Sequence, residues 1–374
     1  MHVFGVGSFS FMINKTGKEK TINVEEFFNE LERLLYKLPT VNDVFIYYSD
    51  KHKERFVEYS DDILGMNVDG RINPFINFLD IKFDISLSKR VQGEIYERMG
   101  FYLPANATTE KFRVHIKNYY YTAVTFVEII DADRDTEGSK AVVLVREYLN
   151  EQFNKLNGYI SFDCQGPSPF HANFYVFDKN DSKCEDVLST KLIEKRGYND
   201  IEIYIEPSCS VNSAEFNIMD FVMNEMISEI DLYYFIITKN KQANNSWDLI
   251  EYQLEELVLL MSGKGNVLNY FKKKKLVDDL LMNLWVFKKD SINRVRAITS
   301  QINEEYSNDK IHFIKLYVDK EIESVTEYSI DDTKSLVQFY EGKNSKAFEM
   351  MITFLTALVG GVVGAIATVL TQGT

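Results

Sequence analysis

Histidine and carboxylate side chains are the groups of this chain that could transfer protons or bind a metal ion, and their spacing favours neither. No two histidines form the HxH or HExxH spacing of a zinc site. The five histidines are His2, His52, His115, His171 and His312. The sequence therefore predicts no metal site built on histidine.

A short acidic run has the alternating carboxylates of a calcium-binding loop, Asp131-Ala132-Asp133-Arg134-Asp135. Such a loop also needs glycine at its sixth position and glutamate at its twelfth. This chain has Thr136 and Val142 there. We therefore interpret the run as a solvated acidic loop and predict no metal.

Two histidines have neighbours that could give them a function. His115 alternates with Arg113 and Lys117 on a predicted strand, so the three side chains share one face. They would suit an anion site, although an exposed polar face of a sheet is the interpretation we favour. His171 follows the turn-rich run Gly166–Pro169 and is the candidate for a functional loop residue.

Nucleotide and hydrolase motifs are missing from the sequence. The pair Gly5-x-Gly7 lacks the third glycine and the following helix of a dinucleotide fingerprint. Neither a Walker A sequence nor GxSxG occurs. We therefore assign no catalytic residue and no cofactor, and the sequence favours a protein that is not an enzyme.

One concentrated basic run stands out, Lys272, Lys273, Lys274 and Lys275, with aromatic residues beside it. Consecutive residues of a helix point in different directions, so four lysines in a row cannot form a single stripe. A solvated helix surface is the simpler interpretation. Contact with lipid headgroups or other phosphate groups is the alternative.

The composition describes an acidic globular protein. Hydrophobic residues make up 45% of the 374 positions, which excludes a disordered chain. The formal net charge is −14, and such a surface disfavours non-specific binding to nucleic acid and to anionic lipid. The three cysteines lack the spacing of a zinc site and are expected to be reduced thiols.

The elements that must position these residues mix strands and helices without a βαβ rhythm, which predicts an α+β fold. Apolar alternation or short apolar runs predict strands over residues 3–13, 44–48, 74–86, 111–130, 159–162, 172–177 and 201–205. Helical spacing predicts helices over 23–38 and 141–156. We place these elements in a mixed domain, residues 1–210.

The sequence becomes mainly helical after residue 210, and we assign 211–346 to a second region. Predicted helices cover 213–238, 246–261, 266–287, 291–306 and 333–340. The first of them is expected to run into a strand at 233–237. A late strand is predicted at 311–318, where apolar residues are again dense.

The C-terminal segment is predicted to be a transmembrane helix, residues 347–370, with a short tail at 371–374. Met350–Leu370 contains no charged residue and would span about 31 Å as a helix, close to the thickness of the hydrocarbon core. A buried core helix is the alternative. Lysines before the segment and none after it place the large domain in the cytoplasm, because flanking positive charges stay on that side.

Small residues form two adjacent rows on this C-terminal helix. Gly360 and Gly364 make a GxxxG pair, and Ala357, Gly361 and Ala365 make a second row. Rows of small residues allow helix backbones to approach closely, so we expect self-association through this helix. A monomeric anchor rich in glycine is the alternative.

These inferences together predict a tail-anchored, single-pass protein of the cell membrane with a cytoplasmic sensing or interaction domain. Its helix would self-associate and act on the membrane, in the manner of a bacterial defence effector. The expected partners are the lipid bilayer, further copies of the chain and a protein ligand, while nucleic acid is not expected. The alternative is a membrane-anchored enzyme that acts on nucleotides or nucleic acid.

Overall fold

The structure, a computed structural model, describes most of the chain. The described residues are 1–13, 21–48, 56–58, 79–102, 109–118, 122–133, 136–156, 160–164, 166–178, 188–205, 217–262, 267–307, 310–324 and 328–372. They form two compact units. Unit 1 contains Met1–Thr238 and Gln301–Glu323, and unit 2 contains Lys239–Ser300 and Ser324–Thr374.

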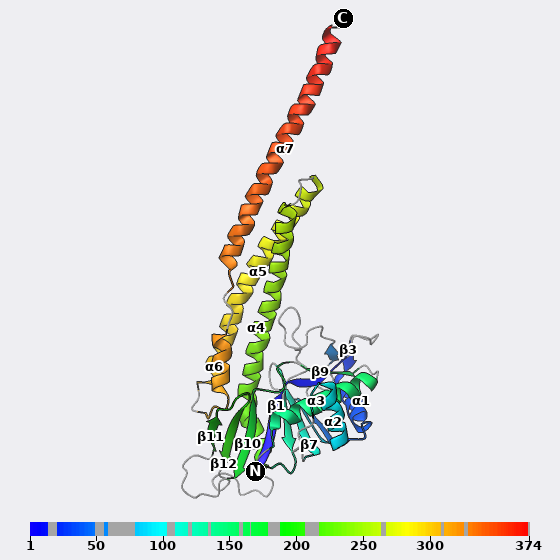
Figure 1. Cartoon of the computed structure of the whole chain (residues 1–374), viewed down its shortest axis with the longest axis vertical. Coiled ribbons are helices and arrows are strands. Elements are labelled where there is room, and N and C mark those ends of the chain that lie inside the picture. Colours follow the sequence, from blue (N-terminus) through cyan, green and yellow to red (C-terminus); the bar gives the residue numbers. More distant parts are fainter. Residues whose placement is uncertain are drawn as a thin grey trace. The chain divides into compact units, whose positions relative to one another are not determined.

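Unit 1 is built on a mixed eight-stranded sheet (Figure 1). The strands lie in the order β11 (Leu188–Ile193), β12 (Asn199–Ile205), β10 (Ala172–Asp178), β1 (His2–Gly7), β8 (Ala123–Ile129), β7 (Lys111–Asn118), β6 (Leu79–Ser86) and β4 (Val41–Tyr47). Only the pair β10 and β12 of this sheet is parallel. The predicted α+β class with a mixed sheet, followed by a mainly helical part, is confirmed.

Apolar and polar residues alternate along the central strands, which gives the sheet two different faces. On β6, Ile81, Phe83 and Ile85 are buried, and they belong to the same core cluster as residues of α1 (Val24–Tyr36) and α3 (Gly138–Leu156). The charged residues between them point to the opposite face. Helix α2 (Lys89–Arg98) adds Ile95 to the apolar cluster.

The predicted first strand, residues 3–13, is two strands. After β1, the chain forms β2 (Phe9–Ile13), which pairs with β9 (Ile160–Cys164) in a separate two-stranded sheet. A second two-stranded sheet joins β3 (Thr21–Asn23) and β5 (Phe56–Glu58). Strand β1 and the start of α3 pack too closely at Gly5 for any side chain. A Cβ there would lie 2.2 Å from the carbonyl oxygen of Gly138.

Three long helices follow. The sequence predicted two of them as pairs of shorter helices and the third only in part. The helices predicted at 213–238 and 246–261 are one helix, α4 (Ile218–Ser262), and those at 266–287 and 291–306 are α5 (Val267–Glu305). The short helix predicted at 333–340 is the first part of α7 (Ile330–Gln372). The unit boundaries near residues 238 and 300 fall inside α4 and α5. The boundary predicted near residue 210 was placed where the sequence changes from mixed strands and helices to mainly helical patterns.

Both strands predicted in this region are wrong. Residues 233–237 belong to α4, and an apolar run buried on all sides has no period that separates a strand from a helix. Residues 311–318 overlap α6 (Lys315–Glu323). Just before that helix, the distant carboxylate of Glu229 binds the amides of Phe313 and Ile314, a contact that local sequence does not record.

The predicted transmembrane helix, and with it the single-pass, tail-anchored membrane localisation, is contradicted. Over the residues that the structure describes, no helix combines the length and apolar character needed to cross a bilayer. Residues 350–370 are the end of α7, a 43-residue helix that carries charged residues from Asp331 to Glu349. The prediction considered the uncharged stretch as a separate helix. The side chains after Ala357 lie outside the described part of the chain.

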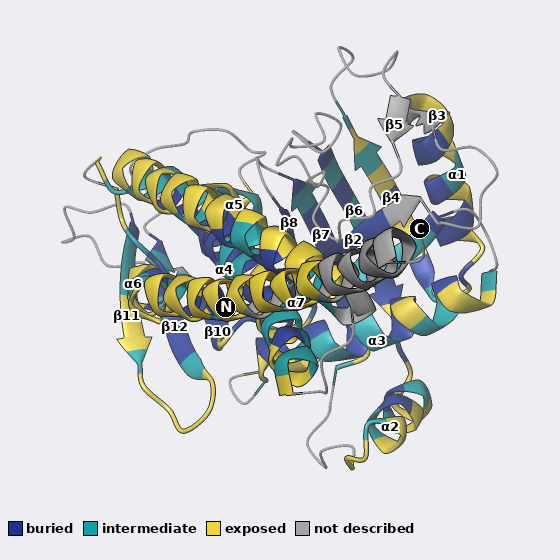
Figure 2. Ribbon diagram, turned by 90° about the horizontal axis from the view of Figure 1, so that it is seen from above, coloured by how far each residue is buried: buried dark blue, intermediate teal, exposed yellow. Residues whose placement is uncertain are grey.

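Unit 2 has an apolar core of its own, formed by α4, α5 and α7. Trp247, Phe287 and Tyr328 pack against one another with ring centroids 4.8–5.2 Å apart. Leu257, Leu280 and Val337 are fully buried in the same cluster. Beyond this core, long stretches of α5 and α7 are exposed (Figure 2).

Candidate functional site

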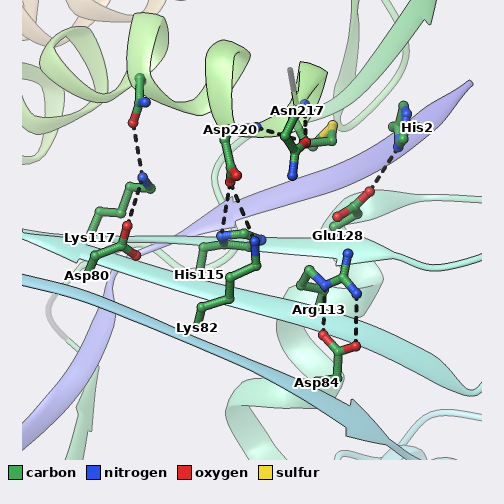
Figure 3. A network of polar contacts seen from close by, with 12 residues as sticks. His2, Asp80, Lys82, Asp84, Arg113, His115, Lys117, Glu128, Asn217 and Asp220 are labelled. Carbon is green, nitrogen blue, oxygen red and sulfur yellow. Dashed lines mark hydrogen bonds and ion pairs between the residues drawn. The ribbon is translucent and has the colours of Figure 1, made fainter. Parts of the chain in front are cut away.

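Charged side chains gather on the second face of the sheet in unit 1, beneath the first turns of α4 (Figure 3). We call this set the polar face. Its members are Asp80, Lys82 and Asp84 on β6, Arg113, His115 and Lys117 on β7, Glu128 on β8, His2 on β1, and Asp220 and Asn224 on α4. Asn217 starts the helix, because its side-chain oxygen accepts a hydrogen bond from the amide of Met219 at 3.0 Å.

The antiparallel register of β6 and β7 places unlike charges opposite each other. Arg113 faces Asp84 and donates two hydrogen bonds to its carboxylate, at 2.7 and 3.0 Å. Lys117 faces Asp80, and their charged atoms are 3.2 Å apart. Such cross-strand pairs stabilise a sheet modestly, by about 0.2–1 kcal/mol each. The strands therefore hold most of the charges in fixed pairs.

Helix α4 contributes the remaining contacts of the polar face. Asp220 lies 3.7 Å from the ammonium group of Lys82 and 3.8 Å from Nδ1 of His115, both longer than hydrogen bonds. One turn later, Asn224 accepts a hydrogen bond from Lys117 at 3.0 Å. These contacts fix the start of α4 above the sheet.

His115 is the most perturbed group of this set. Its side chain is buried, and burial together with the charges of Lys82, Lys117 and Arg113 lowers its pKa to about 3. The ring is therefore neutral at neutral pH, and its Nε2 has no hydrogen-bond partner within the described part of the chain. The sequence placed His115 on an exposed polar face, which is wrong because the start of α4 covers that face.

The chemistry of the polar face is that of a structural contact. An anion site needs a cation that is not already matched, but Arg113, Lys117 and Lys82 each lie beside a carboxylate. A histidine with a pKa near 3 is also a weak base at neutral pH. Among the described residues, no group of three His, Cys, Asp or Glu side chains could hold a metal ion. The polar face therefore orients α4 on the sheet.

Two buried acids fasten α4 further along its length. The carboxylate of Glu229 accepts hydrogen bonds from the amides of Phe313 and Ile314, at 2.7 and 3.0 Å, and one from the hydroxyl of Tyr306 at 2.9 Å. Asp231 accepts two from the amide and hydroxyl of Thr122, at 2.8 and 2.9 Å. Burial nevertheless raises the pKa of Glu229, despite the hydrogen bonds that favour its charged form.

Sequence reasoning missed these two acids, although a signal was present. They are the only acids within the run 221–238 other than Glu225, and the run is otherwise dense in apolar residues. A carboxylate inside such a run must find donors when the run is buried. Its partners, near residues 122 and 313, could not be named without the fold.

The other predicted residues lie elsewhere. His171 is exposed and stacks on Tyr198, with ring centroids 6.1 Å apart. Of the lysine run on α5, Lys273 is buried and the other three lysines are exposed, so the four do point to different sides. Ala357 is exposed on α7. Gly360, Gly361, Gly364 and Ala365 belong to α7, but they lie outside the residues whose surroundings the structure describes.

The helices of unit 2 carry a second apolar row in addition to the row that forms their core. The core rows are Trp247, Ile250 and Leu257 on α4 and Val277, Leu280, Leu284 and Phe287 on α5. The exposed rows are Leu249, Tyr252 and Leu259 on α4 and Phe271, Met282, Trp285 and Ile292 on α5. Members of each row are three, four, seven or eleven residues apart, the spacing of one helix face.

The exposed row of α5 borders a shallow groove of about 480 Å³. Leu281, Met282 and Trp285 line it together with Asp278. Trp285 is 63% exposed and Met282 is 61% exposed, values unusual for such large apolar side chains. Helix α7 continues the pattern, since Phe339, Met350 and Phe354 are exposed as well.

Comparisons with known proteins give this chain no family. No model of a known protein family matches it, and no curated protein matches it. One solved structure is similar to part of it, a chain from the crystal structure of the toxic C-terminal tip of CdiA from Pseudomonas aeruginosa in complex with immune protein. The two are 11% identical over 44% of this chain and 88% of that chain, with a TM-score of 0.17. A likeness this weak supports no inference.

Proposed function

We propose that this chain is a non-enzymatic protein that works by binding another protein through the helices of unit 2. The observation that carries the proposal is the second, exposed apolar row on α4 and α5. Folded monomers expose single apolar side chains commonly, but several large ones on one helix face indicate an interaction surface. The residue types agree, because Trp, Tyr, Phe and Met are enriched at the centres of protein interfaces.

The geometry of unit 1 supports an interaction protein better than an enzyme. The alternative from the sequence was an enzyme acting on nucleotides or nucleic acid. Such a site would need unmatched cations for phosphate groups. On the polar face, the cations Arg113, Lys117 and Lys82 lie beside carboxylates. These matched cations favour an interaction protein. The sensing role of the first domain and the self-association through the small residues of α7, both predicted from the sequence, stay part of this proposal.

Photo-crosslinking within cells tests the proposal directly. A photoreactive amino acid replaces Met282 in the exposed row, and in a matched control it replaces Asp290, which is exposed on another side of α5. We expect light-dependent adducts with a protein from position 282 and few from position 290. Equal yields at the two positions, or no adduct at either, would overturn the proposal.

A further inference from the structure

We infer that the protein bound by unit 2 is a second copy of this chain, with α4 of each copy lying along α5 of the other. This inference rests on the proposed function and names its partner. Both helices that would meet carry an exposed apolar row whose members are three, seven or eleven residues apart, spacings that keep them on one helix face. A surface of this kind needs another helix with the same spacing, and the chain itself supplies two.

Charge complementarity favours a second copy over an unrelated helix. From Asp248 to Ser262, α4 contains only acidic charged residues, of which Asp248, Glu251 and Glu255 are exposed. The start of α5 is basic, with Lys274 and Lys275 exposed beside Phe271. The acidic, apolar face of α4 therefore matches the lysine-rich start of the α5 face, although Asp278 lies on that face beside Met282 and Trp285, and both faces are present in each copy.

Contacts within one copy show which positions of the two helices lie level with each other. Lys272 contacts Glu256 at 3.1 Å, and the rings of Trp247 and Phe287 are 5.2 Å apart. The helices therefore run antiparallel, with the end of α4 beside the start of α5. A two-fold axis parallel to these helices would repeat the same levels between α4 of one copy and α5 of its partner.

At these levels the exposed charges match in pairs. Glu255 lies near the level of Lys275, and Asp248 near that of Lys289, whose ammonium group is 6.0 Å from the centre of the Trp285 ring. Leu249 and Tyr252 on α4, and Met282 and Trp285 on α5, lie between the levels of the two pairs. Because a two-fold contact is self-complementary, each pair would occur twice in the dimer, once on each side of the axis.

Charge exchange between two variants tests this arrangement. The acid variant carries Asp248→Lys and Glu255→Lys, and the base variant carries Lys275→Glu and Lys289→Glu. Alone, each variant would bring like charges together at both contacts, so we expect its dimer dissociation constant to rise about tenfold or more at low salt. Mixed in equal amounts, the two variants have opposite charges at both contacts and should form a heterodimer close to wild-type affinity.

Sedimentation velocity of the full chain and its variants measures these affinities, with one copy fluorescently labelled in the mixture. Recovery in the mixture also shows that both variants are folded. Failure of the mixture to recover, or no loss in either variant, would overturn the proposed pairing. A wild-type chain that stays monomeric at 100 times its concentration in the crosslinked cells would overturn the proposal that the partner is a second copy. Adducts to another protein from position 282 would still support the proposed function.

Discussion

Units 1 and 2 treat their apolar side chains differently. In unit 1, the apolar faces of the sheet and of α1 and α3 enclose each other, and Phe83, Ile81 and Leu31 are at most 1% exposed. In unit 2, each helix buries one apolar row and leaves another exposed. The first pattern is that of a core complete within one chain. The second indicates helices that still have a surface to cover, which is why we assign the interaction to unit 2.

The polar groups of the two units differ as well. Unit 1 buries Glu229, Asp231 and His115, and the two acids have several donors each. The exposed acids and lysines of α4 and α5 in unit 2 lie beside apolar side chains and are solvated. Buried polar groups add specificity to a fold, whereas exposed charges around an apolar row select a partner and its orientation.

The largest expected effect separates the two kinds of apolar residue. Phe83→Ala removes a ring that is fully buried in unit 1, so it should lower the free energy of unfolding by about 3–5 kcal/mol. Met282→Ala removes an exposed side chain in unit 2 and should change it by no more than about 0.5 kcal/mol for the monomer. Urea unfolding at low protein concentration measures both. Similar losses would show that Met282 contributes to a core.

A smaller effect concerns the buried carboxylate of α4. Glu229→Ala leaves the amides of Phe313 and Ile314 without their acceptor, and buried unpaired donors cost about 1–3 kcal/mol. Glu225, exposed on the same helix, is the control, and Glu225→Ala should be nearly neutral. Hydrogen exchange should also rise at residues 313–318, where α6 begins. Unchanged exchange there would contradict a role of Glu229 in holding the segment from which α6 starts.

Local pattern predicted the parts of the fold that depend on one element at a time. The alternation of β6 and β7 and the helical spacing of α1 were sufficient to find those elements and to show which side of each is apolar. The same patterns failed at residues 233–236, where every side chain is buried, and at Lys315, where a helix begins directly after the two amides that Glu229 binds.

The candidate sites were predictable in type but not in pairing. Arg113, His115 and Lys117 were expected on one face, and they are. Their partners on β6 follow from the register of two strands far apart in the sequence, and the burial of His115 follows from α4. The part of α4 in unit 2 was predicted as a helix from its apolar spacing. That spacing alone does not show which apolar residues form the core and which form a second, exposed face.

The smallest expected effect is a pH dependence that originates in the burial of His115. Its folded pKa, about 3, lies below the unfolded value near 6.5, so the unfolded state binds a proton first as the pH falls. Stability from this group is complete well above pH 6.5 and decreases towards pH 3, by about 1.5 kcal/mol between pH 6.5 and pH 5. His115→Gln removes the titrating ring while it keeps a polar side chain, so the variant should lose less stability than wild type over that interval.

Lys82→Met sharpens the test. It removes a nearby positive charge, so the pKa of His115 should rise but stay below 6.5, because burial is the larger cause. Urea unfolding at several pH values and the NMR titration of the His115 ring measure the two effects. Parallel pH profiles for wild type and His115→Gln would mean that His115 titrates alike in the folded and unfolded states, and that the start of α4 does not shield it.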